Sequence, residues 1–305
     1  MSSEFSIEEE LWFGTTPDAE AEQRAARSMV AILVETSGVL PFPAAAVRLL
    51  TITRDPNYSV AEVERLITSD PGLSSKLLRL VNSGAIGLKH PCRSVSDAIT
   101  LLGTNLVRGL AAGSAVLETF RDIGQMGAKI KQDSVVVGGL ARFIAGRRRD
   151  LDAADVYTCA LLHDIGKLMM LQVDKTHYPD LLRQSRQQWN TTHVLERKAN
   201  GFDHGVLAGH LLRSWNIPEP VPTVVAWHHQ SGRAFREGGN VASLVALIRI
   251  ADRVRWALET NPTGDNVDHK ALAQDEGSAY LGLTEEYFRE KWLDLGRIRM
   301  ESMEL

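Results

Sequence analysis

The sequence predicts an all-α protein, and three observations support this fold class. Stretches of about four to eight residues in which apolar and polar side chains alternate, as in a half-buried strand, are nearly absent. Apolar residues recur instead at spacings of three and four, which places them on one face of a helix. Helix-capping residues divide the chain into many short segments of this kind.

Residues typical of helix starts recur along the chain. Ser59 and Glu62 form a capping box, because the Ser hydroxyl can accept an early backbone N–H and the Glu carboxylate can reach back. Asp70 precedes Pro71, so a good N-cap residue is followed by a proline at the first helical position. Further starts are expected at Ser94 with Asp97, at Asp152, at Pro218 and Pro220, and at Thr284. The helix after Ser94 is expected to carry Ile99, Leu102, Leu106 and Leu110 on one face.

The uneven distribution of histidine suggests two lobes with different chemistry. Residues 39 to about 118 contain one histidine, whereas residues from about 130 to 260 contain seven of the nine. The glycine-containing stretch 121–131 is the best candidate for a hinge between them. We therefore expect a helical lobe over residues 37–125 and a second over 126–235. Residues 1–36 form an N-terminal helical extension, and helices in residues 236–305 complete the second lobe.

Composition excludes several classes of protein. Two cysteines cannot build a disulfide framework or an all-cysteine zinc site. The formal net charge of −4 gives no general attraction to DNA, RNA or anionic lipid. No apolar run of about 18 residues indicates a transmembrane helix, and the acidic N-terminus does not resemble a signal peptide. We therefore expect a cytoplasmic protein with no membrane or nucleic-acid partner.

The densest chemical signal is the segment LLHDIGK at residues 161–167. Adjacent residues on a helix lie about 100° apart around its axis, so His163 and Asp164 can both lean towards one ion. An imidazole nitrogen with a carboxylate oxygen suits zinc, iron or manganese. Lys167 has two interpretations: it is an exposed charge near a helix end, or it contacts an anionic group such as a bound phosphate.

Further candidate ligands follow along the chain. His204, His228, His229 and Asp252 bring the set to six nitrogen or oxygen donors on four helical segments, and helical bundles build metal sites in this way. Asp252 lies on an apolar helix, where an unpaired carboxylate is costly. Two alternatives stay open. Asp252 can form a structural salt bridge to Arg249, Arg253 or Arg255, and one histidine of the 228–229 pair can face solvent.

Four other histidines and one cysteine are not assigned as ligands. His177, His193 and His269 lie in polar sequence and are expected at the surface. His210 follows His204 by six residues, so it lies elsewhere around the same helix and is interpreted as a packing or surface residue. Cys159 lies one turn before His163, but an inert buried thiol is the commoner case.

The chain resembles the HDOD family, bacterial regulatory proteins related to the HD superfamily of metal-dependent phosphohydrolases. The most specific match is DPGLSSKLLRLVNS at residues 70–83. The other matches come in the family's order, at residues 40–43, 96–103, 161–167, 203–204, 215–218 and 228–229. The resemblance covers roughly residues 37–235 and implies two helical lobes, the second with an HD-domain core.

One departure from the catalytic superfamily concerns the metal ligands. HD phosphohydrolases supply a histidine from a helix upstream of the HD pair, and by ungapped matching Asp133 occupies that place here. A carboxylate can also bind a metal, so the resemblance implies an altered site. The Gly-Tyr-Pro element of relatives that cleave cyclic di-GMP does not occur in this sequence.

Two functions follow from these observations. The first is a non-catalytic signalling module that binds a protein partner or a small phosphorylated or nucleotide ligand. The alternative is a metal-dependent phosphohydrolase with one or two iron, manganese or zinc ions, in which Asp164 bridges two ions and Lys167 steadies the phosphate. A third function, nucleic-acid binding through the arginines at 147–149, is disfavoured because Asp150 and Asp152 follow them directly. The sequence leaves the oligomeric state open.

Overall fold

The computed structural model describes residues 24, 28, 31, 44–52, 58–83, 86–88, 90–120, 123–146, 148, 150–185, 189–261 and 267–303. Within these residues every regular element is a helix, which confirms the predicted all-α class. Most of the predicted extension over residues 1–36, and the matching motif at residues 40–43, lie outside the described residues.

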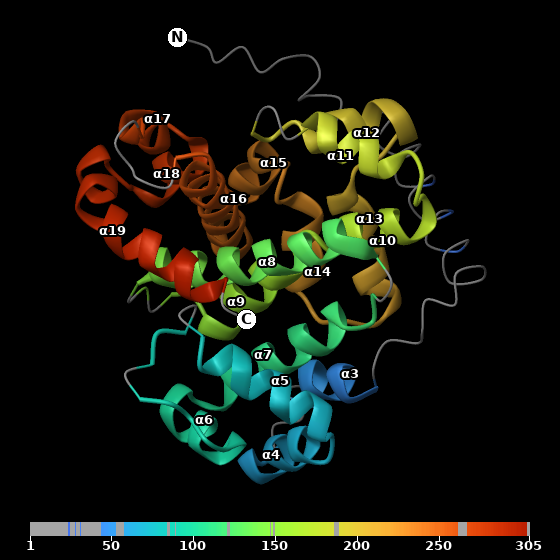
Figure 1. Cartoon of the computed structure of the whole chain (residues 1–305), viewed down its shortest axis with the longest axis vertical. Helices are drawn as coiled ribbons and strands as arrows, with labels where there is room; N and C mark the ends of the chain where they lie inside the picture. The colour runs from blue at the N-terminus through green and yellow to red at the C-terminus, as the bar shows by residue number, and fades with distance from the viewer. Residues whose placement is uncertain are drawn as a thin grey trace.

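The first lobe lies at one end of the molecule, drawn in blue to blue-green in Figure 1. It consists of α3 (Ala44–Thr51), α4 (Val60–Thr68), α5 (Pro71–Val81), α6 (Val95–Leu102) and α7 (Thr104–Leu117). Helix α7 packs against α3, α5 and α6, and it also packs against α9 (Ala153–Leu162) of the second lobe. Helix α7 therefore forms the largest packing contact between the two lobes, and Arg142 of the second lobe adds a hydrogen bond to the Ile86 backbone oxygen at 2.6 Å.

The second lobe is built around two long helices, α8 (Gly124–Ala145) and α16 (Gly239–Thr260). They pack against each other, and α9 packs against both. The rest of this lobe surrounds them (Figure 1). It consists of α10 (Ile165–Val173), α11 (Tyr178–Ser185), α12 (Thr192–Asn200), α13 (His204–Ser214), α14 (Val221–Trp227), α15 (Ser231–Glu237), α17 (His269–Ala273), α18 (Glu276–Leu281) and α19 (Glu285–Ser302).

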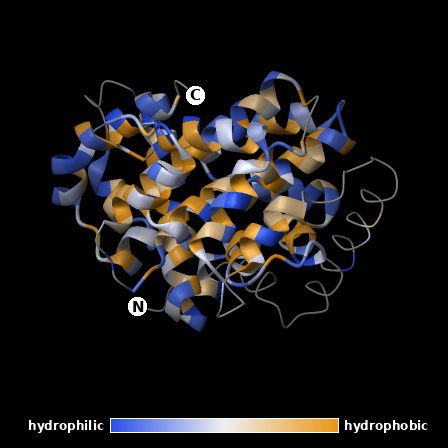
Figure 2. Cartoon of the chain, turned by 90° about the horizontal axis from the view of Figure 1, so that it is seen from below, coloured by the Kyte–Doolittle hydropathy of each residue, from blue (hydrophilic) through white to orange (hydrophobic). Residues whose placement is uncertain are grey.

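Hydrophobic residues are concentrated towards the interior, on the parts of the helices that lie beside other helices (Figure 2). The buried residues of both lobes form one continuous core cluster. At the junction between the lobes, Gly113 of α7 faces Leu161 of α9, and a Cβ on Gly113 would come within 2.6 Å of the leucine Cδ2. The missing side chain lets the two helices approach closely, so burial of apolar surface continues across the boundary between the lobes.

The predicted helix starts are confirmed where the structure describes them. The Ser59 hydroxyl accepts from the backbone N–H of Glu62, and the Asp70 carboxylate accepts from that of Leu73. The same arrangement is found at the other predicted side-chain caps, Ser94, Asp152 and Thr284. Each cap satisfies a backbone N–H group that has no partner within its helix.

Two expectations differ from the structure in their boundaries. The helix after Ser94 ends at Gly103, whose φ of +84° breaks the chain into α6 and α7, so Ile99 and Leu106 belong to different helices. Most of the glycine-containing stretch proposed as a hinge is helical, because α8 already begins at Gly124. Glycines that look like loop residues in a sequence are tolerated inside a long, well-packed helix.

No helix among the described residues has the length and apolar character that a membrane crossing requires.

Asp155 in the first turn of α9 provides a test of the packing between the lobes. Arg108 of α7 is buried and donates to the backbone oxygens of Leu49 and Leu50, both at 3.2 Å. Burial and then the charge of Asp152 raise the pKa of Asp155 from 3.8 to about 6, although Arg108 opposes the shift.

Asp155→Asn is expected to stabilise the protein more at pH 7 than at pH 4. The folded-state pKa lies above the unfolded value, so Asp155 favours the folded state below about pH 4 and this contribution is lost as the pH rises through about 6. Urea unfolding at both pH values measures the difference between variant and wild type. The exposed Asp180→Asn serves as the control. An equal difference at both pH values would contradict the expectation.

Candidate metal centre

His163 and Asp164 lie at the junction between two helices rather than within one. His163 is the C-cap residue of α9, and Asp164 occupies the N-cap position of α10. The chain therefore changes direction at this pair, which places both side chains in the protein interior. His163 is 2% and Asp164 is 7% exposed.

Gly166, three residues after His163, allows this junction to lie close to the next candidate ligand, His204. Gly166 packs directly against the backbone of His204, the first residue of α13. A Cβ on Gly166 would lie 2.0 Å from the His204 carbonyl oxygen, a distance that no side chain can adopt. The glycine therefore allows Asp164 and His204 to come together.

Four imidazole rings are oriented in the same way by oxygen atoms. A carbonyl or carboxylate oxygen only accepts a hydrogen bond, so each Nδ1 beside one carries the proton and donates it. The Nδ1 atoms of His163 and His228 bond the backbone oxygens of Ala160 at 2.6 Å and Val225 at 2.7 Å. Those of His204 and His229 bond Glu196 Oε2 at 2.6 Å and Asn190 Oδ1 at 2.9 Å. Each ring thus turns its Nε2 inwards.

Three of these Nε2 atoms converge on one small volume. His204 Nε2 lies 3.2 Å from His228 Nε2 and 3.0 Å from His229 Nε2. Asp164 Oδ1 lies 3.1 Å from His204 Nε2 and has no hydrogen-bond partner, although it is buried. The ligand atoms of Asp164, His204, His228 and His229 all lie within 4.8 Å of one another. Lone pairs so close together repel unless a proton or a cation lies between them, and this donor set fits a transition-metal ion.

Protonation of the cluster is uneven. Burial lowers the pKa of His204, but the carboxylate of Glu196 raises it further, so the pKa is about 9. Burial and the neighbouring imidazoles lower the pKa of His228 and His229 well below the usual value. Burial raises the pKa of Asp164, but His163 and Lys167 lower it more, so the carboxyl is ionised. The cluster can hold one proton, on His204, or one cation in its place.

Several residues that support the cluster are absent from the sequence-based prediction. Glu196 of α12 is fully buried and also accepts a hydrogen bond from Tyr178 and one from the His204 backbone N–H at 2.9 Å. Asn190 orients His229 from a loop. Metal-ligating histidines need such oriented partners. In the sequence, Glu196 is recognisable only as a glutamate eight residues before His204. The segment around it is polar and has no apolar pattern that predicts burial.

The structure places Asp252 and Asp133 near the cluster but in ion pairs with side-chain cations. Asp252 Oδ1 lies 2.8 Å from Arg255 Nε, the salt bridge considered as the alternative to a ligand. Asp133 lies 3.5 Å from Arg255 and also pairs with Lys129. Arg249 and Arg253 pair instead with Asp275. Neither Asp252 nor Asp133 belongs to the group of converging ligand atoms.

His163 also lies outside that group, although its Nε2 is 3.4 Å from Asp164 Oδ2. The alternative in which one histidine of the 228–229 pair faces solvent does not hold, because both turn towards His204. The expectation of a surface position is wrong for His193, which is buried and stacks on His229 with ring centroids 4.3 Å apart. His177 is exposed as expected, and Cys159 is a buried thiol.

A cavity of about 260 Å³ opens beside the cluster. Its lining includes Asp164, His229, Asp133, Asp252 and Lys167. Lys167 is mostly buried, and its ammonium group lies 2.8 Å from Asp164 Oδ2. Of the two interpretations of Lys167, the exposed charge near a helix end therefore does not describe this lysine. Its cation faces the cavity together with Arg255 and Lys129.

Comparison with known proteins identifies relatives of this chain. Residues 39–231 match the model of the HDOD domain. An uncharacterized protein of Treponema pallidum (strain Nichols) is 28% identical over 217 residues, which cover 68% of this chain and 41% of that protein. The chain thus spans about two fifths of the length of this curated relative.

Two crystal structures share the fold. An HDOD domain protein of unknown function from Geobacter sulfurreducens is 20% identical, with a TM-score of 0.71 and coverage of 94% of this chain and 100% of that one. A protein from Shewanella amazonensis SB2B, provisionally named a phosphohydrolase, is 21% identical, with a TM-score of 0.69 and coverage of 90% and 98%. The neighbours confirm the helical fold expected from the sequence.

Gly166→Ala is expected to destabilise the protein by about 3 kcal/mol or more, because overpacking against a rigid backbone cannot be relieved by a side-chain rotation. Gly296→Ala in α19 is the matched control. Its new Cβ would make only an ordinary contact, 3.8 Å from Leu258. That variant should be as stable as the wild type or about 1 kcal/mol more stable, since alanine favours a helix. Denaturant unfolding measures both, and equal stability of the two variants would contradict the proposed close approach.

Proposed function

The chain belongs to the HDOD family, and on this premise we propose that it is a regulatory binding module whose second lobe holds a single divalent transition-metal ion. The observation that carries this proposal is the division of the candidate ligands into two groups. Asp164, His204, His228 and His229 converge with lone pairs facing one another, whereas Asp133 and Asp252 are bound to side-chain cations.

The first group would hold the ion through three imidazole nitrogens and one carboxylate oxygen. This set suits iron, manganese or zinc, and the geometry of the donors does not select among them. When bound, the ion would supply a positive charge that polarises an attached group. It would also connect the start of α10, the start of α13 and the end of α14, which are far apart in the sequence.

The second group argues against a second ion. The guanidinium of Arg255 contacts Asp252, Asp133 and Glu259, and Lys129 contacts Asp133 and Glu259. These two cations already neutralise the carboxylates that a second ion would need, and a further dication beside them would be repelled. The dinuclear arrangement in which Asp164 bridges two ions is therefore not our proposal.

The regulatory role is the function that this altered site supports best. A module of this kind would change the state of a signalling protein or respond to a small phosphorylated ligand, and the single ion would stabilise the fold of the second lobe. Nucleic-acid binding through the basic run is not favoured, because the one arginine of that run that the structure describes, Arg148, pairs with Asp150 at 2.6 Å.

A second candidate, hydrolysis of a phosphoester, is favoured by one specific observation. Lys167 and Asp164 face the same cavity beside the cluster, and the lysine cation could contact a phosphate there. The provisional name of the Shewanella amazonensis protein belongs to that protein and adds only an analogy of fold.

Metal analysis is expected to find about one equivalent of iron, manganese or zinc per chain after reconstitution. His204→Ala and His228→Ala remove a converging donor and should leave well below half an equivalent. Asp252→Asn should keep about one equivalent, because Asp252 contacts Arg255 rather than the cluster. The exposed His177→Ala is the control for a histidine without a role in binding. Elemental analysis of untagged protein measures all five.

Three outcomes of that measurement would contradict the single-ion proposal. Two equivalents in the wild type would mean that the ion pairs of Arg255 open to admit a second metal. Loss of metal from Asp252→Asn would mean that this carboxylate is a ligand. No metal in any form, with the fold intact by circular dichroism, would reject the metal centre altogether.

Metal-loaded wild-type protein is expected to hydrolyse p-nitrophenyl phosphate and bis(p-nitrophenyl) phosphate no faster than the His204→Ala variant does. The physical reason is that Arg255 and Lys129 occupy the ligands of the second ion. A metal-dependent rate that disappears in His204→Ala and in Lys167→Ala would instead establish the hydrolase and assign Lys167 a catalytic contact.

A further inference from the structure

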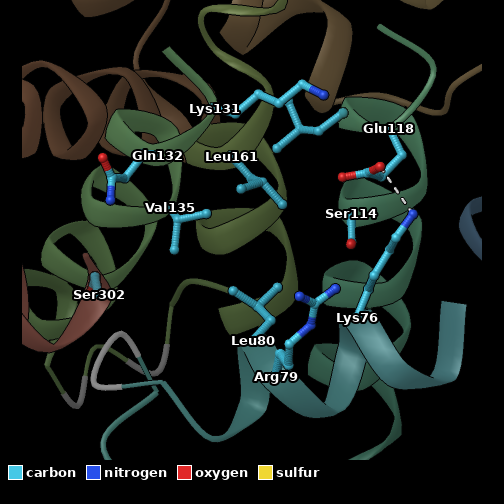
Figure 3. Close-up of a pocket in the computed structure, with 11 residues that line it drawn as sticks. Lys76, Arg79, Leu80, Ser114, Glu118, Lys131, Gln132, Val135, Leu161 and Ser302 are labelled. Carbon is cyan, nitrogen blue, oxygen red and sulfur yellow. Dashed lines mark ion pairs between the residues drawn. The ribbon is translucent and has the colours of Figure 1, made fainter. Parts of the chain in front are cut away.

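A cavity of about 250 Å³ lies between the two lobes (Figure 3). Helices α5 and α7 of the first lobe line one side of it, and α8 with Leu161 of α9 lines the other. Two of its lining residues, Lys76 and Glu118, form an ion pair at 3.0 Å, and Lys131 donates to the backbone oxygen of Phe120 at 2.7 Å. These contacts join α5 to the end of α7, and α8 to the residues that follow α7. The cavity therefore belongs to the junction between the lobes.

The histidine cluster depends more directly on a segment of the second lobe, residues 189–193, which leads into α12. This segment contacts His229 in two ways. The Oδ1 atom of Asn190 accepts a hydrogen bond from His229 Nδ1 at 2.9 Å. The His193 ring stacks on the His229 ring, with centroids 4.3 Å apart and planes 12° apart. One short segment thus fixes both the rotation and the plane of this imidazole.

His229 differs from the other rings of the cluster in the origin of its support. The Nδ1 atoms of His163 and His228 bond backbone oxygens three residues earlier, and that of His204 bonds Glu196, eight residues earlier. The acceptor for His229 lies 39 residues earlier, and His229 itself lies in a turn after α14. Local helix geometry therefore does not place this ring, and its position depends on how the segment 189–193 is held.

The segment is anchored near both of its ends. At the start, Trp189 lies against two cations of α16, since the Cζ atoms of Arg249 and Arg253 are 5.2 Å and 5.0 Å from the ring centroid. Both distances are typical of cation–π contacts. The indole Nε1 is buried and has no hydrogen-bond partner in the part of the chain that the structure describes, so the polar contacts of this ring are those with the two guanidinium groups. Near the other end, the Thr192 hydroxyl donates to that of Ser185 at 2.9 Å.

The two arginines are themselves fixed in place. They lie one turn apart on α16 and share one carboxylate, because Arg249 Nε is 3.0 Å from Asp275 Oδ1 and Arg253 Nη1 is 2.8 Å from Asp275 Oδ2. Asp275 is buried and also caps α18. One carboxylate between two guanidinium groups leaves an excess of positive charge, which the electron-rich face of an indole stabilises.

We propose that residues 189–193 form a brace that positions His229 as a ligand, and that Trp189, held by Arg249 and Arg253, anchors this brace. The inference rests on the single-ion site proposed for the second lobe. These are positioning residues, because they contact the ligand or its support and not the ion. Loss of the anchor would let the His229 ring turn away, so the metal would bind more weakly although all four donors are still present.

Asn190→Gly separates the hydrogen bond from the backbone turn. Asn190 has a φ of +62°, which glycine also adopts, so the variant keeps the turn and loses only the acceptor. Its zinc affinity, measured by competition with a chromogenic chelator, should fall about ten- to a hundredfold, as for loss of a partner that orients a metal-ligating histidine. Asn190→Asp retains an acceptor and tolerates this φ, so it should bind zinc as the wild type does. With cobalt(II) in place of zinc, the visible absorption spectrum should change in Asn190→Gly only.

Trp189→Ala tests the anchor and should lower zinc affinity in the same direction. Trp189→Phe should restore most of the affinity, because a ring still faces the two guanidinium groups. Tyr287→Ala is the matched control, since it removes a part-buried ring that contacts Phe288 on α19. It should lower stability in urea and leave zinc affinity unchanged. Equal loss of affinity in Tyr287→Ala, or none in Trp189→Ala, would overturn the role of the anchor.

NMR of the metal-free protein with ¹⁵N-labelled histidine separates the failure of this proposal from that of the single-ion site. His229, identified by the signal missing from His229→Gln, should carry its proton on Nδ1 in the wild type and in Asn190→Asp, and lose this preference in Asn190→Gly. A wild type that shows this dependence but binds no metal would reject the ion and leave the brace. An unchanged tautomer in Asn190→Gly would overturn the brace. If the wild type binds zinc, unchanged affinity in Asn190→Gly would overturn it as well.

Discussion

The lone pairs of three imidazole rings share one small volume with a buried carboxylate, and the surrounding structure is arranged around this requirement. Each ring is held by an oxygen atom on its Nδ1 side, so it cannot turn its Nε2 away from the centre. Glu196, Asn190 and a backbone oxygen of α14 supply these contacts. The repulsion between the lone pairs is relieved by a proton on His204 or by a cation, so the cluster could hold a metal ion in place of that proton.

A second electrostatic constraint concerns the number of cations that the cluster can hold. In a poorly hydrated interior each carboxylate needs a positive partner. Asp133 and Asp252 have found theirs in Arg255 and Lys129, whereas Asp164 turns one oxygen towards Lys167 and leaves the other without a hydrogen bond. Cations carried by the chain thus neutralise the carboxylates that lie beside the histidine cluster. These ion pairs are the basis of the single-ion site that we propose.

The two lobes are packed directly against each other. Helix α7 lies against α9, and α8 extends from the boundary between the lobes into the centre of the second lobe. Helix α9 connects the cavity between the lobes with the histidine cluster, because Leu161 lines the cavity and His163, two residues later, caps the end of this helix beside Asp164. An occupant between the lobes would therefore contact the same helix that ends at the metal centre.

The sequence by itself determined the all-α class, the capped helix starts, the family and the short list of donors, because these depend on local periodicity and on residue types within a few positions. It could not separate ligands from ion pairs. His204, His228 and His229 converge with Asp164, whereas Asp252 and Asp133 meet Arg255, and that choice depends on residues up to about a hundred and twenty positions apart. The buried positions of His193 and Glu196 were likewise decided by the tertiary structure, since their polar surroundings in the sequence carry no signal of burial.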